Sequence, residues 1–240
     1  MKITVLTLFP SMFEGFLNSS IIKRIIDKGL VEVKLVDIRD YSKDKHRHVD
    51  DTPYGGGAGM LMKVDVVSDA LKANRSDGSY VILTSPKAYP LKQMDLVNLS
   101  KKDDIVIICG HYEGIDARIE NYVDQKVSIG DYVLTGGELA SMVLIDGVSR
   151  LLDEGISEDS LLEESYNDGL LEYPQYTRPV EYDGMLVPEV LQNGNHKEIK
   201  KFNLKNALSE TLKYRPDLLD NRQLTKEEKD LLEEIQEYNK

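Results

Sequence analysis

One stretch decides the fold that this sequence predicts: Ile105-Val106-Ile107-Ile108-Cys109, followed at once by Gly110-His111-Tyr112-Glu113-Gly114. The first five residues form an apolar run short enough for a buried strand. A polar, helix-like segment and a second short strand around residues 126–128 come next, and a second glycine-punctuated loop spans residues 129–137. A helix is expected over residues 138–150. Loops that follow buried strands of an α/β sheet form the crevice in which such folds bind ligands.

Both loops are rich in glycine, which lets a backbone approach a ligand closely and adopt positive φ. They match neither the dinucleotide fingerprint Gly-x-Gly-x-x-Gly nor a phosphate-binding loop, which needs Gly-Lys followed by Ser or Thr. Each loop alone is about equally well explained as a turn that uses glycine to end a helix. Tyr112 and Glu113 in the first loop, with Asp131 and Tyr132 in the second, favour a ligand site.

The chain before this stretch alternates strand and helix patterns. Strands are expected at residues 2–8, 31–36 and 80–84, and helices at residues 11–29, 64–73 and 90–99. The first helix is predicted from the capping-box spacing Ser11–Glu14, with Gly29 as its C-cap, and Pro90 is placed in the first turn of the last. Residues 39–59 are polar, then glycine-rich, and are expected to be irregular. The pattern predicts the α/β class with parallel strand crossovers.

The chain changes character after residue 160. Residues 161–174 are acidic, lack clear periodicity and are predicted to be an interdomain linker. Helices are expected after Gly184, at residues 188–191, 195–214 and 225–238, the last opened by a capping box at Thr225–Glu228. The sequence therefore predicts an α/β domain over residues 1–160 and a small all-α domain over residues 175–240.

The bulk composition narrows the cellular context. A chain of 240 residues can bury a core without cross-links, and Cys109 is its only cysteine, which suits a reducing compartment. At the end of a buried strand, Cys109 is expected to be inert. The sequence shows neither a signal-peptide pattern nor the ~20 consecutive apolar residues of a membrane span, so a cytoplasmic location is expected.

The net charge of −12 argues against a nucleic-acid partner, but the charges are segregated along the chain. Residues 151–174 carry eight acidic and no basic side chains, whereas residues 195–215 carry six basic and two acidic ones. A local positive face is therefore compatible with the sequence, and so is an ordinary solvated helix surface. No membrane or DNA partner is expected.

Several blocks of the sequence, in order, resemble one family of enzymes. They are Val49–Met60, Gly110–Asp116, Ile129–Glu138, Asp168–Leu171, Tyr176–Pro179, Gly194–His196 and Arg215–Leu219. Together they cover nearly the whole chain and resemble the bacterial tRNA (guanine-N1)-methyltransferases, the TrmD family of SPOUT methyltransferases. The resemblance implies a parallel-sheet SPOUT fold with a trefoil knot at the C-terminal end of the α/β domain. It also implies a homodimer whose active site lies at the subunit interface.

The same resemblance implies methyl transfer from S-adenosyl-L-methionine to N1 of guanosine 37, just 3′ of the anticodon of a tRNA. Asp168 matches the family's general base, which would take the N1 proton, and Arg150 matches the cation that would stabilise charge on O6. From spacing alone, Asp168 is an ordinary linker carboxylate and Arg150 a favourable cation at a helix C-terminus. Glu113 and Asp131 resemble contacts to the cationic end of the methyl donor. The other cofactor-binding residues that the resemblance implies are Ser85, Pro86, Gly110, Tyr112, Gly114, Ile129, Gly130, Tyr132, Val133, Leu134, Gly136 and Gly137.

The chain departs from the family pattern at a few positions. Ala58 stands where proline is common, which should alter loop stiffness more than chemistry. His111 stands where many relatives carry arginine, and Phe202-Asn203 stands where many carry Trp-Arg. These changes remove positive charge from regions expected near tRNA. The resemblance further implies a magnesium dependence, although the sequence shows no cluster of metal ligands.

Two other functions stay open at this stage. One is a different knotted methyltransferase that acts on ribosomal RNA or on ribose, against which the Asp168 block and the loop at residues 55–59 argue. The other is a nucleotide-binding regulatory module without catalysis, which needs the glycine loops but leaves Asp168 and Arg150 unexplained. Methyl transfer to tRNA transcripts that differ only at position 37 separates the three hypotheses.

Overall fold

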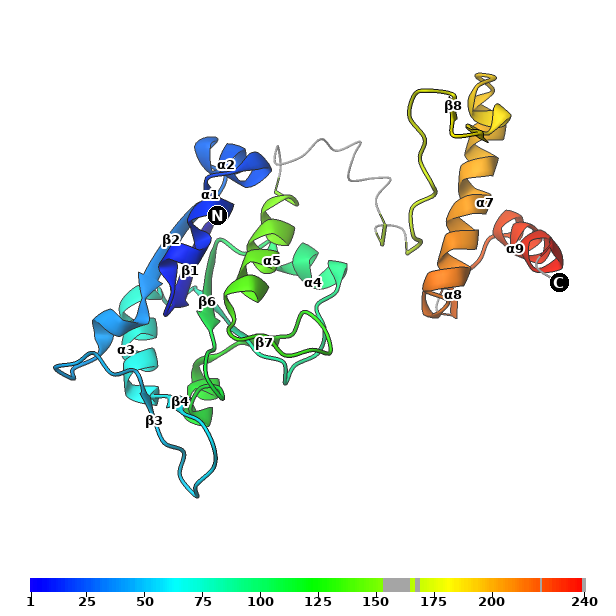
Figure 1. Ribbon diagram of the computed structural model, residues 1–240. Coiled ribbons are helices and arrows are strands. Elements are labelled where there is room, and N and C mark those ends of the chain that lie inside the picture. The colour runs from blue at the N-terminus through cyan, green and yellow to red at the C-terminus, as the bar shows by residue number, and fades with distance from the viewer. Residues whose placement is uncertain (153–164, 167–168, 221, 239–240) are drawn as a thin grey trace. The chain divides into compact units, whose positions relative to one another are not determined.

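The computed structural model describes residues 1–152, 165–166, 169–220 and 222–238. The chain forms two compact units, Met1–Ile156 and Ser157–Lys240, which are described separately below (Figure 1). None of the helices in the described part of the chain combines the length and the apolar character that crossing a membrane requires.

The first unit is built on a five-stranded parallel sheet. Its strands are β1 (Lys2–Thr7), β2 (Glu32–Asp37), β5 (Tyr80–Thr84), β6 (Asp104–Cys109) and β7 (Gln125–Val127). Their spatial order is β2-β1-β6-β5-β7, and every neighbouring pair is parallel. The predicted α/β class with a parallel sheet is confirmed, and the strands lie within about two residues of their predicted positions.

Helices cover both faces of this sheet, as buried parallel strands require. On one face, α3 (Val64–Asn74) packs with Leu6 and Ile108 in one apolar cluster. On the other face, α2 (Ser20–Asp27), α4 (Gln93–Leu99) and α5 (Glu138–Ser149) pack with Val5 and Ile107 in a second cluster. Successive strand residues thus enter opposite layers because side chains alternate across a strand.

The helix predicted over residues 11–29 is wrong as a single element. The segment forms η1 (Pro10–Phe13), α1 (Glu14–Leu17) and then α2, and no side-chain capping bond forms at η1. The Asn18 side-chain amide donates to the Glu14 carbonyl at 2.8 Å, and Ser20 has a φ of 52°. The chain turns between Asn18 and Ser20, at residue types that are unfavourable inside helices, and this turn interrupts the helix.

Three further segments differ from or refine the expectation. The helix expected from Pro90 begins at Gln93, because Pro90 forms an isolated parallel bridge with Ser128 after β7. The segment predicted to be irregular, residues 39–59, overlaps η2 (Ile38–Tyr41) and contains β3 (Asp50–Asp51), which pairs antiparallel with β4 (Leu61–Met62) just after the segment. The polar segment after β6 forms η3 (Ala117–Tyr122).

The second unit is mainly helical. It contains η4 (Glu189–Leu191), α7 (His196–Tyr214), α8 (Asp217–Asp220) and α9 (Lys226–Tyr238), with the hairpin β8 (Glu181–Tyr182) and β9 (Met185–Leu186). The all-α prediction missed this hairpin. The core comprises Leu170, Ala207, Leu208, Leu231, Leu232 and Ile235. The end of the predicted linker therefore packs against the helices.

Side-chain caps begin both long helices of this unit, and the sequence predicted the one at α9. The Asn195 side chain accepts a hydrogen bond from the Lys197 backbone N–H at 3.2 Å at the start of α7. At α9, the Thr225 N–H donates to the Glu228 carboxylate at 2.7 Å and the Glu228 N–H donates to the Thr225 hydroxyl at 3.2 Å. This reciprocal pair is the predicted capping box.

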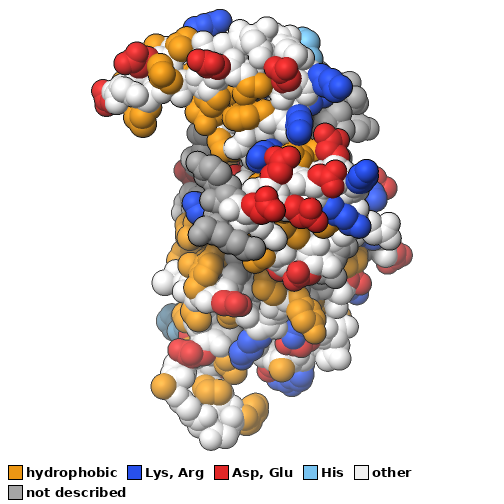
Figure 2. Space-filling view, turned by 90° about the vertical axis from the view of Figure 1, so that its right-hand side faces the viewer, with side chains coloured by type: hydrophobic (Ala, Val, Ile, Leu, Met, Phe, Trp, Pro, Cys, Tyr) orange, Lys and Arg blue, Asp and Glu red, His pale blue; other side chains and the backbone are white. Residues whose placement is uncertain are grey.

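Charge on the helical unit is more mixed than the segregation along the sequence suggests. Lys205 of α7 forms an ion pair with Glu234 of α9 at 2.8 Å. Figure 2 shows acidic side chains crowded together on the visible face, with basic ones among and beside them. Lys197, Lys200 and Lys201 are exposed and lie nearer the start of α7.

Candidate functional site

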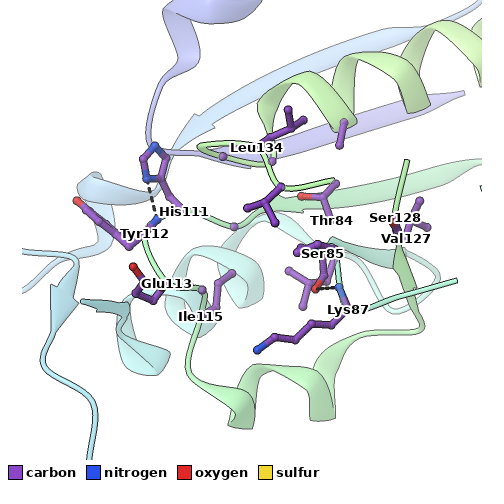
Figure 3. A pocket seen from close by; sticks show the side chains of 18 of the residues that line it. Thr84, Ser85, Lys87, His111, Tyr112, Glu113, Ile115, Val127, Ser128 and Leu134 are labelled. Atoms are coloured by element: carbon purple, nitrogen blue, oxygen red, sulfur yellow. Dashed lines mark hydrogen bonds between the residues drawn. The ribbon is translucent and has the colours of Figure 1, made fainter. Parts of the chain in front are cut away.

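A cavity of about 430 Å³ lies at the edge of the sheet where β5, β6 and β7 end (Figure 3). This volume falls within the roughly 300–1,000 Å³ typical of small-molecule sites. Three loops line the cavity, at residues 83–87, 110–115 and 127–137. Every residue that the sequence suggested for cofactor binding lines it, except Asp131. The carboxyl edge of a parallel sheet is where α/β folds place their ligands.

The loop after β5 forms one wall. The Thr84 hydroxyl donates to the Ile108 carbonyl at 3.1 Å, and the Ser85 N–H donates to the Val127 carbonyl at 2.9 Å, so this loop is fixed to both neighbouring strands. The Ser85 hydroxyl accepts the N–H of Lys87 at 3.1 Å. Thr84 and Lys87 line the cavity but were missed from the sequence. Their position beside Ser85-Pro86, at the end of a strand, was the available signal.

The loop after β6 forms the opposite wall, and Figure 3 shows His111, Tyr112 and Glu113 together on that side. The Glu113 N–H donates to the Met60 carbonyl at 3.1 Å, which ties the loop to the end of the glycine-rich segment. A Cβ on Gly59 would collide with the Glu113 side chain. The glycine-rich segment therefore packs against the Glu113 side chain, a contact that the sequence alone did not predict.

The loop after β7 closes the cavity and joins the other glycine loop. The Ser128 hydroxyl donates to the Gly130 carbonyl at 3.0 Å, and the Tyr132 hydroxyl donates to the Ile129 carbonyl at 3.2 Å. The Gly137 N–H donates to the Gly110 carbonyl at 2.8 Å, and His111 and Gly136 form an antiparallel bridge. The two loops singled out in the sequence thus meet, and their main chains are hydrogen bonded.

Buried polar groups anchor the start of α5 beneath these loops. Glu138 is only 2% exposed, and one of its carboxylate oxygens accepts a hydrogen bond from the Thr7 hydroxyl of β1 at 2.8 Å. The Ser141 hydroxyl donates to the Gly137 carbonyl at 2.8 Å and lies 3.1 Å from the Cys109 sulfur. Burial raises the pKa of the Cys109 thiol, so it stays protonated and unreactive, as predicted.

Neither of the two residues suggested for catalysis is among the described residues that line this cavity. Asp168 lies outside the described residues. Arg150 is the C-cap of α5, whereas Ala140, in the first turn of that helix, lines the cavity. At a rise of 1.5 Å per residue, Arg150 is roughly 15 Å along the helix from the cavity wall. One chain therefore does not bring Arg150 to its own cavity.

No group of three or more His, Cys, Asp or Glu side chains is placed to hold a metal ion among the residues that the structure describes. The polar groups of the cavity lining include main-chain amides and carbonyls of the glycine loops, the Ser85 hydroxyl, the Lys87 amine and the Glu113 carboxylate. Such a wall can recognise the edges of a heterocycle and both signs of charge on one small molecule.

The fold and the cavity define a class of protein: an α/β protein with a cavity of small-molecule size, walled by glycine loops at the carboxyl edge of a parallel sheet. Comparison with known proteins narrows the class. The family model described as tRNA (Guanine-1)-methyltransferase TrmD matches residues 1–221. The chain belongs to this family, a family of methyltransferases, and the resemblance seen in the sequence is confirmed.

Curated relatives match over nearly their full length. The chain is 48% identical to the tRNA (guanine-N(1)-)-methyltransferase of Dictyoglomus turgidum, over 98% of this chain and 96% of the relative. It is 50% identical to the enzyme of the same name from Citrifermentans bemidjiense, over 100% of this chain and 98% of the relative. A third, from Carboxydothermus hydrogenoformans, is 51% identical over 97% of this chain and 92% of the relative.

Proposed function

We propose that this protein transfers a methyl group from S-adenosyl-L-methionine to N1 of guanosine 37 in tRNA. One observation carries the proposal: the family's two glycine loops come together around a single cavity of suitable size, at the edge of the sheet where ligands bind. The proposal extends to this chain the activity named for relatives about half identical to it over nearly the whole length.

The cavity fits the donor in size and in chemistry. S-adenosyl-L-methionine supplies an activated methyl group on a cationic sulfur. Main-chain groups near Gly110 and Gly136 face the cavity and can pair with the edge of the adenine ring. Glu113 offers a carboxylate to the cationic end of the donor, and an added Cβ on Gly114 would meet no atom within 4 Å, so the ligand can approach that backbone.

The acceptor chemistry requires a base and a cation. N1 of guanine carries a proton, and we assign its removal to Asp168, a contribution of roughly 10²–10⁴-fold in rate. Negative charge then develops on O6, and we assign its stabilisation to the fixed charge of Arg150. These assignments rest on the family motifs, because Asp168 lies outside the described residues and Arg150 lies at the far end of α5.

We propose that a second copy of the chain completes each site. Helix α5 buries Leu144, Ile145 and Val148 in its own unit, yet Leu139 and Val143 on its outer face are 50% and 45% exposed. Leu139 and Val143 lie one turn apart on this face, beside the exposed Asp146, and form an apolar strip that a partner could cover. We assign the Arg150 and Asp168 that act at each cavity to the partner chain, because Arg150 lies at the far end of α5 from the cavity of its own chain.

We also propose that the chain has the trefoil knot that the SPOUT resemblance implies. The return of residues 129–137 from edge strand β7 to Gly110 supports this proposal.

Complementation between two inactive variants tests this shared site. Asp168→Asn should remove the base, and Gly110→Val should obstruct the donor cavity. Co-expression of the two, with separate affinity tags, yields mixed dimers that carry one intact cavity facing one intact Asp168. We expect such dimers to recover methyl transfer that neither variant has alone. Dimers that stay inactive would contradict a site shared between subunits.

We assign donor binding to the α/β unit and tRNA contacts to the helical unit, and we place the reaction in the cytoplasm. The decisive experiment supplies the protein with isotope-labelled donor and tRNA transcripts carrying guanosine or adenosine at position 37. Label in N1-methylguanosine, found only with guanosine 37, is the expected result. Label in ribose or in ribosomal RNA would favour another RNA methyltransferase, and donor binding without transfer would favour a regulatory module. Repeating the assay with EDTA tests the magnesium requirement that the family implies.

A further inference from the structure

The cavity wall contains one residue with an unusual backbone conformation. Tyr112 has a φ of 57°, in the left-handed region that L residues rarely adopt. The other non-glycine residues with positive φ in the described part of the chain are Ser20, Arg47, Tyr166 and Asp183. Of these five, Tyr112 alone lines the cavity. Such conformations persist where the surroundings hold them, and they cluster at ligand sites.

The residue before it supplies a contact that holds this conformation. The Nδ1 atom of His111 accepts the backbone N–H of Tyr112 at 2.8 Å, the bond drawn as a dashed line in Figure 3. The Gly114 N–H donates to the His111 carbonyl at 3.1 Å and closes the turn around Tyr112. Because Nδ1 accepts, the neutral imidazole carries its proton on Nε2.

The imidazole itself is held in place by its neighbours. Its ring centroid lies 5.0 Å from that of Phe9 and 5.0 Å from that of Tyr112. A Cβ added to Gly136 would lie 2.9 Å from His111 Cδ2, so the second glycine loop passes close against the ring. The His111 backbone bridges to Gly136 as well. His111 therefore has a fixed orientation from which Nδ1 points at one backbone N–H.

We propose that His111 is a positioning residue whose Nδ1 keeps the Tyr112 backbone in its left-handed conformation and thereby shapes the donor cavity. Without this acceptor, the Tyr112 N–H loses its partner and the residue is free to relax to negative φ. The peptide between Tyr112 and Glu113 would then turn, and both cavity-lining residues would move. The inference rests on the proposed function in one respect, the identity of the ligand as S-adenosyl-L-methionine.

Three substitutions at His111 distinguish the contribution of the Nδ1 acceptor from that of the aromatic ring. His111→Asn keeps an acceptor, because the asparagine oxygen takes the place of Nδ1, but gives up the ring. His111→Phe keeps a ring against Phe9 and Gly136 but has no acceptor. His111→Gln moves the acceptor one bond further along, to the place of Nε2, and serves as the second acceptor-loss variant if the phenylalanine variant does not fold.

The test measures the dissociation constant of S-adenosyl-L-methionine by calorimetry on the full chain. We expect His111→Asn to bind within about twofold of wild type, and His111→Phe and His111→Gln to bind about 2- to 12-fold more weakly, the range for loss of one hydrogen bond. KM for the donor should rise by the same factor while kcat at saturating donor is retained. Wild-type affinity in the Phe and Gln variants, or equal weakening in Asn and Phe, would overturn the proposal.

The same substitution in a Tyr112→Gly protein tests whether His111 acts through the backbone conformation of residue 112. Glycine adopts positive φ without strain, so a Tyr112→Gly protein no longer needs the His111 acceptor. In that background, His111→Phe should change donor affinity by less than about twofold, whatever Tyr112→Gly does by itself. If His111→Phe weakens donor binding as much with glycine at position 112 as with tyrosine, the mechanism is refuted. If wild-type protein itself fails to bind S-adenosyl-L-methionine, the proposed function fails; if it binds and the variants do not differ, only this inference fails.

Discussion

Gly137→Ala provides a stringent test of the way the two glycine loops are joined. Gly137 has an ordinary φ of −84°, so its replacement is opposed by lack of space and not by backbone strain. An added Cβ would collide with the Thr84 hydroxyl and would lie 2.9 Å from both Cys109 Cα and Gly110 N. The latter two are main-chain atoms at the end of β6, whose neighbours β1 and β5 prevent an easy shift.

The cost follows from these contacts. Overpacking a dense site typically costs about 1–3 kcal/mol. Displacing the loop would also lose the Gly137–Gly110 hydrogen bond, worth about 1 kcal/mol. The sum is a loss of about 2–4 kcal/mol in the free energy of unfolding. For a protein of this size it corresponds to a melting temperature lower by roughly 4–16 °C.

Gly110→Ala is the matched control because the two glycines are hydrogen-bonded partners. A Cβ on Gly110 would meet only ordinary contacts, at 3.5 Å from the Thr84 carbonyl oxygen and 4.0 Å from Ile115. Thermal unfolding should therefore lie within about 2 °C of wild type. Donor affinity should nevertheless fall, and a bulkier Gly110→Val should abolish donor binding, if this backbone faces the ligand.

Thermal unfolding with and without S-adenosyl-L-methionine measures both effects, since a bound ligand raises stability by RT ln(1 + [L]/Kd). We expect Gly137→Ala to lower the melting temperature without ligand, and Gly110→Val to remove the ligand-induced increase. A Gly137→Ala protein that melts like wild type would refute the packing argument. Unchanged donor affinity in a folded Gly110→Val protein would show that Gly110 serves only the turn.

Three further predictions concern catalysis, RNA and pH. Asp168→Asn should abolish methyl transfer and spare donor binding, since an amide cannot take the N1 proton; turnover above about a tenth of wild type would exclude Asp168 as the base. Changing Lys197, Lys200 and Lys201 together to Ala should weaken tRNA binding and reduce its log–log salt slope by roughly 2–3. Lys205→Ala, which removes a lysine already paired with Glu234, should change the slope less. Burial opposes ionisation of Glu228, but the Thr225 N–H and Arg222 outweigh it and hold the Glu228 pKa below its ordinary value of 4.5. The stabilisation by Glu228 should be complete above pH 4.5 and lost as the pH falls through that lower pKa, so Glu228→Gln should flatten acid unfolding of the helical unit followed by circular dichroism.

Local pattern predicted the parallel sheet well and the first helix poorly. The strand at Tyr80–Thr84 was predicted to the residue, because β-branched and apolar residues end abruptly at Ser85-Pro86. The segment at residues 11–29 has apolar residues at helical spacing, yet Asn18 ends α1 and Ser20 turns the chain before α2. Periodicity indicates which residues become buried, and it does not indicate where a local turn of the backbone interrupts a helix.

For the site, the sequence predicted the two glycine loops and about half of the residues that line the cavity. It could not determine that Glu138 would be buried against Thr7, 131 residues earlier, or that Gly59 would support Glu113. The roles of His111 and Gly137 were also decided only by the fold, which brings Gly136 and Gly137 against the end of β6. The physical reason is the distance along the chain over which sequence rules apply. Sequence rules describe neighbours within a turn of helix or a pleat of strand, whereas close packing and burial of polar groups depend on which distant segments the sheet order places side by side.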